Sequence, residues 1–243
     1  METLSQVKNN LKELRLLSMY ENVEGRNNEA IKTKMSYADF LLLLTQGEID
    51  RRKHMKRERL IKKARLGKYK HIVEFDFDYN PKINRQKILN FTSCEFIRRN
   101  ENIIFAGSTG VGKTFIAKAI GLEACHREYT VLFTRTIKML EEIHRGKADG
   151  TYQKRLNKYL KPQLLILDDW GLQAFSDAML SILNEIISER YEEGSIIITS
   201  NRPIEKWSEL FKEPVISSAL LDRLFHQAHK IKIVGKSYRR MIK

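Results

Sequence analysis

The chain has 243 residues, of which 42% are hydrophobic and 30% charged, and it carries a net charge of +14 at neutral pH. Its apolar runs are too short to cross a bilayer, and its N-terminus lacks the continuous apolar stretch of a secretory signal. Two cysteines, Cys94 and Cys125, and six scattered histidines form neither a disulfide framework nor a zinc-ligand pattern. We therefore expect a cytoplasmic globular protein with no membrane partner and with both thiols buried.

The positive charge is concentrated in one short window. Residues 51–70 hold eleven Lys or Arg and one acid, whereas residues 1–50 hold six basic and eight acidic side chains. Cations gain affinity for nucleic acids by displacing counterions from phosphates, whereas crowded cations on an isolated helix repel one another. The window therefore favours nucleic acid over a solvated helix face, and its lack of Trp and Phe disfavours a membrane surface. The candidate DNA-binding residues are Arg51, Arg52, Lys53, Lys56, Arg57, Arg59, Lys62 and Lys63.

The N-terminal part of the chain has the periodicity of helices. Apolar residues recur at steps of three or four through the first 20 residues, which predicts a helix that faces a core. Ser36 followed by Asp39 is typical of a helix start, and we expect a second helix from there to Leu66, with a break near Gly47. The pattern changes after Gly67, where a connector begins.

From residue 102 onward, short apolar runs alternate with helical stretches. This alternation predicts a parallel sheet with helices on both faces. The expected strands are 102–106, 130–134, 164–167, 195–199 and 230–234. We therefore expect an α/β domain over residues 71–243, preceded by a small, basic, all-helical domain over residues 1–70.

The first expected strand leads into GSTGVGKT, residues 107–114, which fits the phosphate-loop pattern G-x-x-x-x-G-K-[ST] at every fixed position. Glycines let backbone amides face a phosphate chain, and the helix that follows adds partial positive charge. Lys113 can reach the β- and γ-phosphates, and the Thr114 hydroxyl can bind Mg²⁺. A Gly-rich turn without a ligand is disfavoured by the flanking strand and helix. The expected nucleotide-binding residues are Gly107, Ser108, Thr109, Gly110, Val111, Gly112, Lys113, Thr114 and Phe115.

Polar side chains also end two later strands. Asp168 and Asp169 follow the strand at 164–167, so we expect Asp168 to complete the Mg²⁺ shell and Asp169 to orient a water for attack on the γ-phosphate. Asn201 ends the next strand, where it either hydrogen-bonds to the γ-phosphate or the water, or begins a turn. The residues around Arg223 indicate by themselves only an ion pair with Asp222 or a neighbour.

Five motifs, GSTGVGKT, LLILDDWG, ITSNRP, ALLDRL and GKSYR, resemble in this order the IstB/DnaC branch of the AAA+ ATPases. The likeness is greatest to the IstB helper ATPases that are encoded beside the transposases of insertion sequences. It implies an AAA+ P-loop fold, ATP and Mg²⁺ as cofactors, and a homo-oligomer that binds DNA, duplex favoured, and a cognate transposase. In this family Asn201 would be the sensor, Arg223 the arginine finger that acts on the ATP of the next subunit, and Arg239 a second sensor. Because Asp169 stands where many AAA+ proteins have Glu, we expect slow hydrolysis.

Related initiator and loader ATPases carry an additional helix that faces DNA after the second strand. The matching stretch, residues 137–162, offers a second basic site, with a solvated helix as the alternative. Its candidate DNA contacts are Arg145, Lys154, Arg155 and Lys158. The sequence thus favours a transposition helper over two alternatives, a DnaC-like loader of a replicative helicase on single-stranded DNA and a nucleotide-gated DNA scaffold with little ATP turnover.

Overall fold

The computed structural model describes residues 2–238 of the chain. By their contacts the residues divide into two units, Met1–Arg59 and Leu60–Lys243. This division falls about ten residues before the boundary expected near residue 70, because Ile61, Ala64 and Leu66 are buried in the core of the second unit. None of the helices within residues 2–238 is long and apolar enough to cross a membrane.

Helices alone build the first unit: α1 (Glu2–Glu13), α2 (Leu17–Thr33) and most of α3 (Tyr37–Ala64). The first expected helix ends early, because the chain turns at Arg15, which has a left-handed φ of 57°. The start of α3 is as expected, with the backbone N–H of Asp39 donating to Oγ of Ser36 at 3.1 Å.

The break expected near Gly47 is wrong, since α3 runs without interruption from Tyr37 to Ala64. One glycine costs a helix only about 1 kcal/mol relative to alanine, and the flanking residues form helices well. A Cβ on Gly47 would lie 3.4 Å from Oγ of Ser18. A Cβ at this position would make an ordinary van der Waals contact with α2, so the packing of the two helices does not require the glycine.

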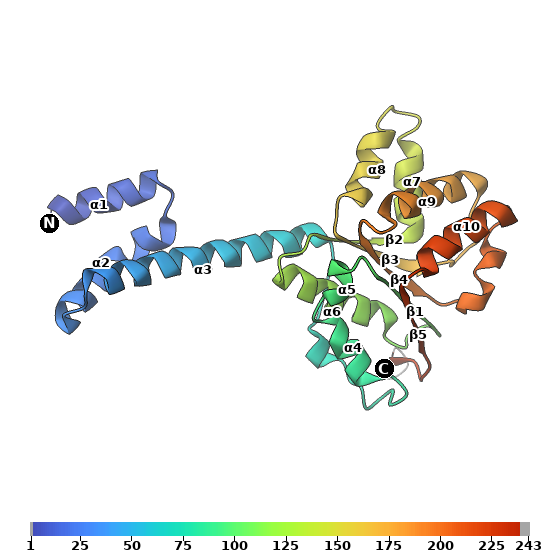
Figure 1. The fold of residues 1–243 in the computed structure, drawn as a ribbon, viewed down its shortest axis with the longest axis horizontal. Coiled ribbons are helices and arrows are strands. Elements are labelled where there is room, and N and C mark those ends of the chain that lie inside the picture. The colour runs from blue at the N-terminus through green and yellow to red at the C-terminus, as the bar shows by residue number, and fades with distance from the viewer. Residues whose placement is uncertain (1, 239–243) are drawn as a thin grey trace. The chain divides into compact units, whose positions relative to one another are not determined.

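A parallel sheet forms the centre of the second unit, with its strands in the order β2-β3-β4-β1-β5 (Figure 1). The strands are β1 (Asn102–Gly107), β2 (Val131–Arg135), β3 (Leu164–Trp170), β4 (Ser195–Ser200) and β5 (Ala228–Ile233). All five overlap the expected strands, which confirms the predicted α/β class.

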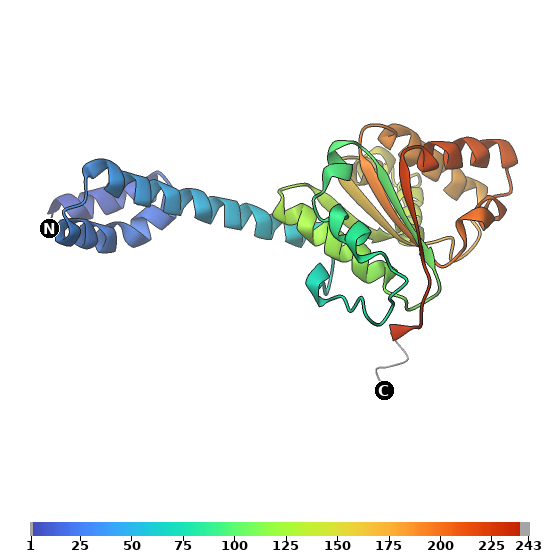
Figure 2. The same ribbon diagram turned by 60° about the horizontal axis from the view of Figure 1, so that its bottom comes forward.

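Helices cover both faces of this sheet (Figure 2). One face carries α4 (Arg85–Phe91), α5 (Glu95–Arg98) and α6 (Lys113–His126). The other face carries α7 (Thr136–Arg145), α8 (Tyr152–Leu160), α9 (Asp177–Arg190) and α10 (Pro214–Phe225), with the short helices η2 (Ile204–Lys206) and η3 (Ser208–Leu210). Side chains alternate between the two cores along β1 and β4, as the pleat requires.

Both cysteines are buried in the core on the α6 side of the sheet, as expected. Burial raises the pKa of the Cys94 thiol to about 11 and that of the Cys125 thiol to about 12. Both thiols are therefore protonated at neutral pH and act as apolar packing groups.

Candidate nucleotide-binding site

The loop between β1 and α6 has a backbone that only glycine tolerates at two positions. Gly112 has a φ of 101°, and a Cβ there would lie 2.5 Å from the ring of Phe75. Gly110 has a φ of 83°, and its Cβ would lie 2.1 Å from Oγ of Ser237. The glycines thus let the loop curve tightly beneath two other segments of the chain.

Most of the expected loop residues line one pocket of about 810 Å³. Its lining includes Thr109, Gly110, Gly112, Lys113, Thr114 and Phe115. The side chain of Val111 is instead fully buried in the core, so only its backbone can face a ligand. Gly107 and Ser108 contribute through their carbonyls, which accept hydrogen bonds from Lys113.

Lys113 and Asn201, which are 88 positions apart in the sequence, meet at the carboxyl ends of the strands. The ammonium of Lys113 donates to the carbonyls of Gly107 and Ser108, each at 2.8 Å, and to Oδ1 of Asn201 at 2.7 Å. The side chain is only 6% exposed, and such a cation needs polar partners. The structure therefore brings Asn201 into contact with the lysine of the phosphate loop.

Asp168 is buried and surrounded by threonines. Its Oδ1 accepts a hydrogen bond from Oγ of Thr114 at 2.7 Å and a second from Oγ of Thr199. Its backbone carbonyl accepts a bond from Thr136 at 3.0 Å. A carboxylate and a hydroxyl in contact are oxygen donors of the kind that Mg²⁺ prefers, so this pair fits the expected ion.

Asp169 is directed into the pocket by an irregularity of β3. Its φ is 57°, and the β3–β4 register shifts between Leu167 and Trp170. Such bulges re-aim side chains at strand ends. Oδ2 of Asp169 lies 3.7 Å from Nε of Arg135, the last residue of β2. Sequence reasoning did not identify Arg135, and the only available signal was its position directly after an apolar strand.

Aromatic residues from three segments form another wall of the pocket. Phe75, which follows the short helix η1 (Ile72–Glu74), lies 5.4 Å from Phe115 and 5.6 Å from Tyr238 between ring centroids. The backbone N–H of Tyr238 donates to the carbonyl of Gly110 at 2.9 Å. These rings offer a flat apolar surface of the kind that a nucleotide base stacks against. Sequence reasoning named only Phe115 of this wall and missed Phe75 and Tyr238, because these two rings come from distant segments.

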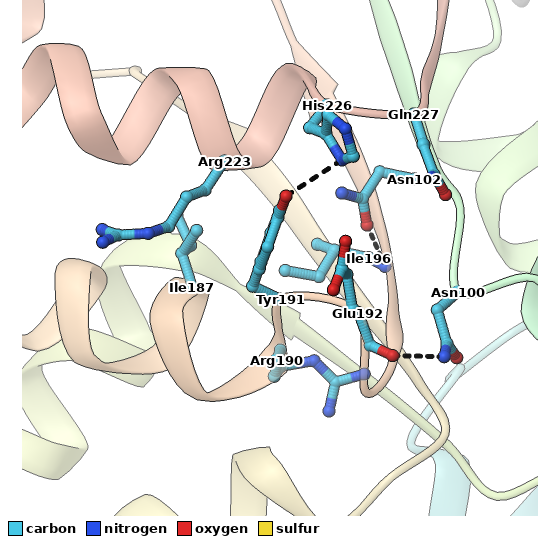
Figure 3. A pocket seen from close by; sticks show the side chains of 10 residues that line it. All are labelled: Asn100, Asn102, Ile187, Arg190, Tyr191, Glu192, Ile196, Arg223, His226 and Gln227. Atoms are coloured by element: carbon cyan, nitrogen blue, oxygen red, sulfur yellow. Dashed lines mark hydrogen bonds between the residues drawn. The ribbon is translucent and has the colours of Figure 1, made fainter.

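Arg223 lies elsewhere, in the last turn of α10, next to a small pocket at the amino ends of the strands (Figure 3). Asn102, which begins β1, and Gln227, which precedes β5, line the same pocket. The guanidinium extends away from the other residues drawn, and Nη1 donates to Oδ1 of Asn184 at 3.5 Å. Arg223 thus lies at the opposite end of the sheet from Lys113. The other expected arginine, Arg239, lies outside the described residues.

The two predicted basic sites differ in how many of their candidate cations pair with acids of the same chain. In the second site, Nη2 of Arg155 contacts Asp149 at 2.5 Å, and Lys158 pairs with Glu142. Arg145 and Lys154 of this site are exposed.

In the N-terminal basic window, Arg51 is half-buried and Arg52 pairs with Glu48 at 2.8 Å. The rest of that window's candidate residues are exposed: Lys53, Lys56, Arg57, Arg59, Lys62 and Lys63.

Comparison with known proteins identifies the family. The family model described as IstB-like ATP binding protein matches residues 9–243. The insertion sequence IS232 ATP-binding protein of Bacillus thuringiensis subsp. berliner is 35% identical over 96% of this chain and 94% of its own length. The insertion sequence IS21 ATP-binding protein of Pseudomonas aeruginosa is 32% identical over 94% of this chain and 86% of its own length.

Solved structures share the fold of the second unit. The crystal structure of DnaI superposes with a TM-score of 0.58 at 23% identity, covering 69% of this chain and 89% of that one. The DnaC helicase loader superposes with a TM-score of 0.55 at 22% identity, covering 71% of this chain and 97% of that one. The phosphate loop, the polar strand ends and these matches confirm the resemblance first noticed in the sequence, and the chain belongs to the family of IstB-like ATP-binding proteins.

Proposed function

We propose that this protein is an ATP-dependent DNA-binding helper of transposition, which assembles on duplex DNA, hydrolyses ATP slowly and recruits or activates its transposase in the cytoplasm. The observation that carries the proposal is the convergence of Lys113, Asn201, Thr114 and Asp168 at one edge of the sheet. The relatives named for insertion sequences support the role in transposition.

Each polar residue at this edge has a chemical task in hydrolysis. Lys113 and the loop amides would bind the β- and γ-phosphates, and Asn201 would position the γ-phosphate. Thr114 and Asp168 would hold Mg²⁺, which neutralises phosphate charge when bound. Asp169 would orient the attacking water as a general base. Its carboxylate is one methylene shorter than that of Glu, which is the reason to expect slow turnover.

The place of Arg223 favours an active site shared between subunits. Arg223 lies at the amino ends of the strands, whereas the phosphate loop lies at their carboxyl ends, so the guanidinium cannot reach the nucleotide of its own chain. In a head-to-tail assembly the same side chain can serve the pocket of the next copy. We therefore propose a homo-oligomer with ATP at its subunit interfaces, in which Arg223 and Arg239 act on phosphate.

DNA would bind through cations that the fold leaves exposed. On the uninterrupted helix α3, Lys56 and Arg57 follow Lys53 by three and four positions, and the three cations therefore share one face. Such contacts reach phosphates without reading the bases. In the second basic site, Arg145 and Lys154 are the favoured contacts, because Arg155 and Lys158 already pair with acids of the same chain.

Replacing Lys113 by alanine tests the nucleotide part of the proposal. The variant should lose at least about tenfold in ATP affinity and fail to assemble on DNA, because the phosphates lose their cation. Binding is measured with a fluorescent ATP analogue, and Lys87→Ala on the exposed face of α4 is the matched control. If Lys113→Ala binds ATP and assembles like the natural protein, the phosphate-loop assignment is incorrect.

Two other functions remain as alternatives, each with its own discriminating result. The shared fold of the DnaC helicase loader favours a loader, whose assembly would respond to single-stranded rather than duplex DNA. Asp169 favours a nucleotide-gated scaffold that scarcely turns ATP over. The scaffold is the better description if the natural protein turns over negligible ATP on DNA and Asp169→Glu does not raise that rate.

A further inference from the structure

A groove lined by three lysines borders the nucleotide pocket. This lysine groove has a volume of about 590 Å³ and is lined by Gly67, Lys68, Tyr69, Lys70, Phe115 and Lys118. It contains no carboxylate among its lining residues, although Lys70 has Glu74 as a partner at 3.6 Å. All of these residues belong to the second unit.

Of the three lysines that line this groove, Lys118 is the most buried. It lies on α6, one helical turn after Thr114, with its ammonium 4.5 Å from the ring centroid of Phe133. A Cβ on Gly67 would lie 3.7 Å from Nζ of Lys118, so the loop after α3 passes beside this ammonium. Burial lowers the pKa of Lys118 and the charge of Arg135 lowers it further, while Asp168 opposes both. The groove therefore brings together the positive charges of three lysines, which a bound anion would stabilise.

The groove and the nucleotide pocket share a wall. Lys70 and Phe115 line both cavities. The Phe115 ring lies 5.4 Å from Phe75, which faces the nucleotide pocket together with Tyr238. A ligand in the groove can thus shift the packing of a residue that also lines the nucleotide pocket.

The sequence that leads into the groove favours a nucleic acid backbone as the anion. No Asp or Glu occurs between Glu58 and Glu74, and this stretch holds six Lys or Arg. Ile61, Ala64 and Leu66 are buried in the second unit, which leaves Lys62 and Lys63 exposed at the end of α3. An exposed Tyr69 among lysines is also typical of surfaces that contact nucleic acids.

We propose that the lysine groove is a DNA-backbone site which couples DNA binding to nucleotide binding. Lys68 and Lys118 contact phosphates of the DNA. Phe115, which lines both cavities, transmits the effect of these contacts to the bound nucleotide. The inference rests on the proposed function, since it requires that this chain bind both DNA and ATP. It adds residues that neither predicted basic site includes. Because coupling is reciprocal, a nucleotide that tightens DNA binding must itself be bound more tightly on DNA by the same factor.

The test measures the affinity for a fluorescent duplex with and without a non-hydrolysable ATP analogue, at several salt concentrations, in the full chain. The ratio of the two dissociation constants is the coupling factor. For Lys68→Gln/Lys118→Gln we expect this factor to fall at least about fivefold towards one, within the range of measured couplings. The slope of log affinity against log salt should fall by about two, since two phosphate contacts are lost.

Two controls separate coupling from affinity and from misfolding. Lys56→Gln, on α3, should weaken DNA binding equally in both nucleotide states and leave the coupling factor unchanged. Lys87→Gln, on an exposed part of α4, should change neither quantity. The double variant should bind the ATP analogue normally without DNA, because neither Lys68 nor Lys118 lines the nucleotide pocket.

The outcomes distinguish failure of the inference from failure of the proposed function. A natural protein that binds no DNA in any nucleotide state contradicts the proposed function, and the inference falls with it. A natural protein that couples the two ligands, with a double variant that keeps its coupling factor and salt slope, overturns the inference alone. That result would direct the search to an acidic polypeptide as the occupant of the groove.

Discussion

At the scale of single residues, the pair of Arg135 and Asp169 controls the carboxylate that would act on water. The two side chains are 73% and 36% exposed, and their contact spans 3.7 Å. An ion pair this exposed contributes about 0–1 kcal/mol to stability. Its importance lies in the direction of the carboxylate, because a carboxylate held by Arg135 is less available to orient a water.

Removing Arg135 should therefore release Asp169. We expect Arg135→Ala to raise kcat for ATP hydrolysis by about two- to fivefold without DNA, a small change in transition-state stabilisation. Phosphate release at saturating ATP and Mg²⁺ is the measurement, and Arg98→Ala, whose side chain pairs with Glu95, is the control. A fall in kcat would instead indicate that Arg135 itself contacts the nucleotide.

The residues of the site differ in how far sequence could predict them. Lys113 and Thr114 follow from local spacing, because the phosphate loop is contiguous in the chain. Thr199 contacts Asp168 and Arg135 contacts Asp169 only because β4 and β2 flank β3. No local sequence pattern predicts this order of strands. Sequence reasoning therefore identified the loop and missed Thr199 and Arg135, the partners that neighbouring strands supply.

At the scale of elements, Glu142 joins α7 to α8. Its carboxylate accepts hydrogen bonds from Lys158 and, at 2.7 Å, from the hydroxyl of Tyr159. Burial alone would raise the pKa of Glu142, but these hydrogen bonds and the charge of Lys158 bring it below its usual range. The network explains why Lys158 is less available to DNA than its sequence position indicated.

The lowered pKa of Glu142 predicts a pH-dependent contribution to stability. A carboxyl whose folded pKa is depressed stabilises the fold above its unfolded pKa of about 4.3, and this contribution is lost as pH falls through the folded value. Glu142→Gln should lower the free energy of unfolding by about 1–3 kcal/mol at pH 7.

Urea unfolding followed by circular dichroism at pH 7 and at progressively lower pH measures this difference. The two proteins should converge in stability as pH falls through the lowered pKa of Glu142, because the carboxyl of the natural protein becomes protonated there. A difference that stays constant across the whole range would show that the substitution acts through packing instead.

Three strands, β1, β3 and β4, were predictable as elements because they are buried on both faces and are therefore continuously apolar, as in Leu164–Leu167. The edge strand β5 is only partly buried. The helices of the first unit were harder to delimit. The turn at Arg15 is not marked by a glycine or a proline, and Gly47, which was taken for a break, lies inside the continuous helix α3. Hydrophobic periodicity therefore did not predict where α1 ends or that α3 is continuous.

At the scale of the whole molecule, the opposite placement of Lys113 and Arg223 predicts complementation between subunits. Asp169→Asn, which keeps Lys113 to bind ATP, and Arg223→Ala should each abolish most ATP turnover on DNA. An equal mixture should recover about a quarter of the natural rate, since one interface in four would combine an intact Asp169 with an intact Arg223 in a head-to-tail assembly.

This mixing experiment is read as phosphate release at constant total protein, with each variant alone as the reference. Arg99→Ala, a basic residue outside both pockets, serves as the control and should lose no activity. A mixture no more active than its components would argue that Arg223 has no role in the pocket of a neighbour.

The central claim is that ATP and duplex DNA together drive assembly of this chain. The most direct measurement is the molecular mass by light scattering at fixed salt, with and without ATP and Mg²⁺, in the presence of duplex or single-stranded DNA. We predict large assemblies only when ATP and duplex are both present. A mass that rises only with single strands would favour a helicase loader, and a mass that never responds to ATP would contradict nucleotide-gated assembly.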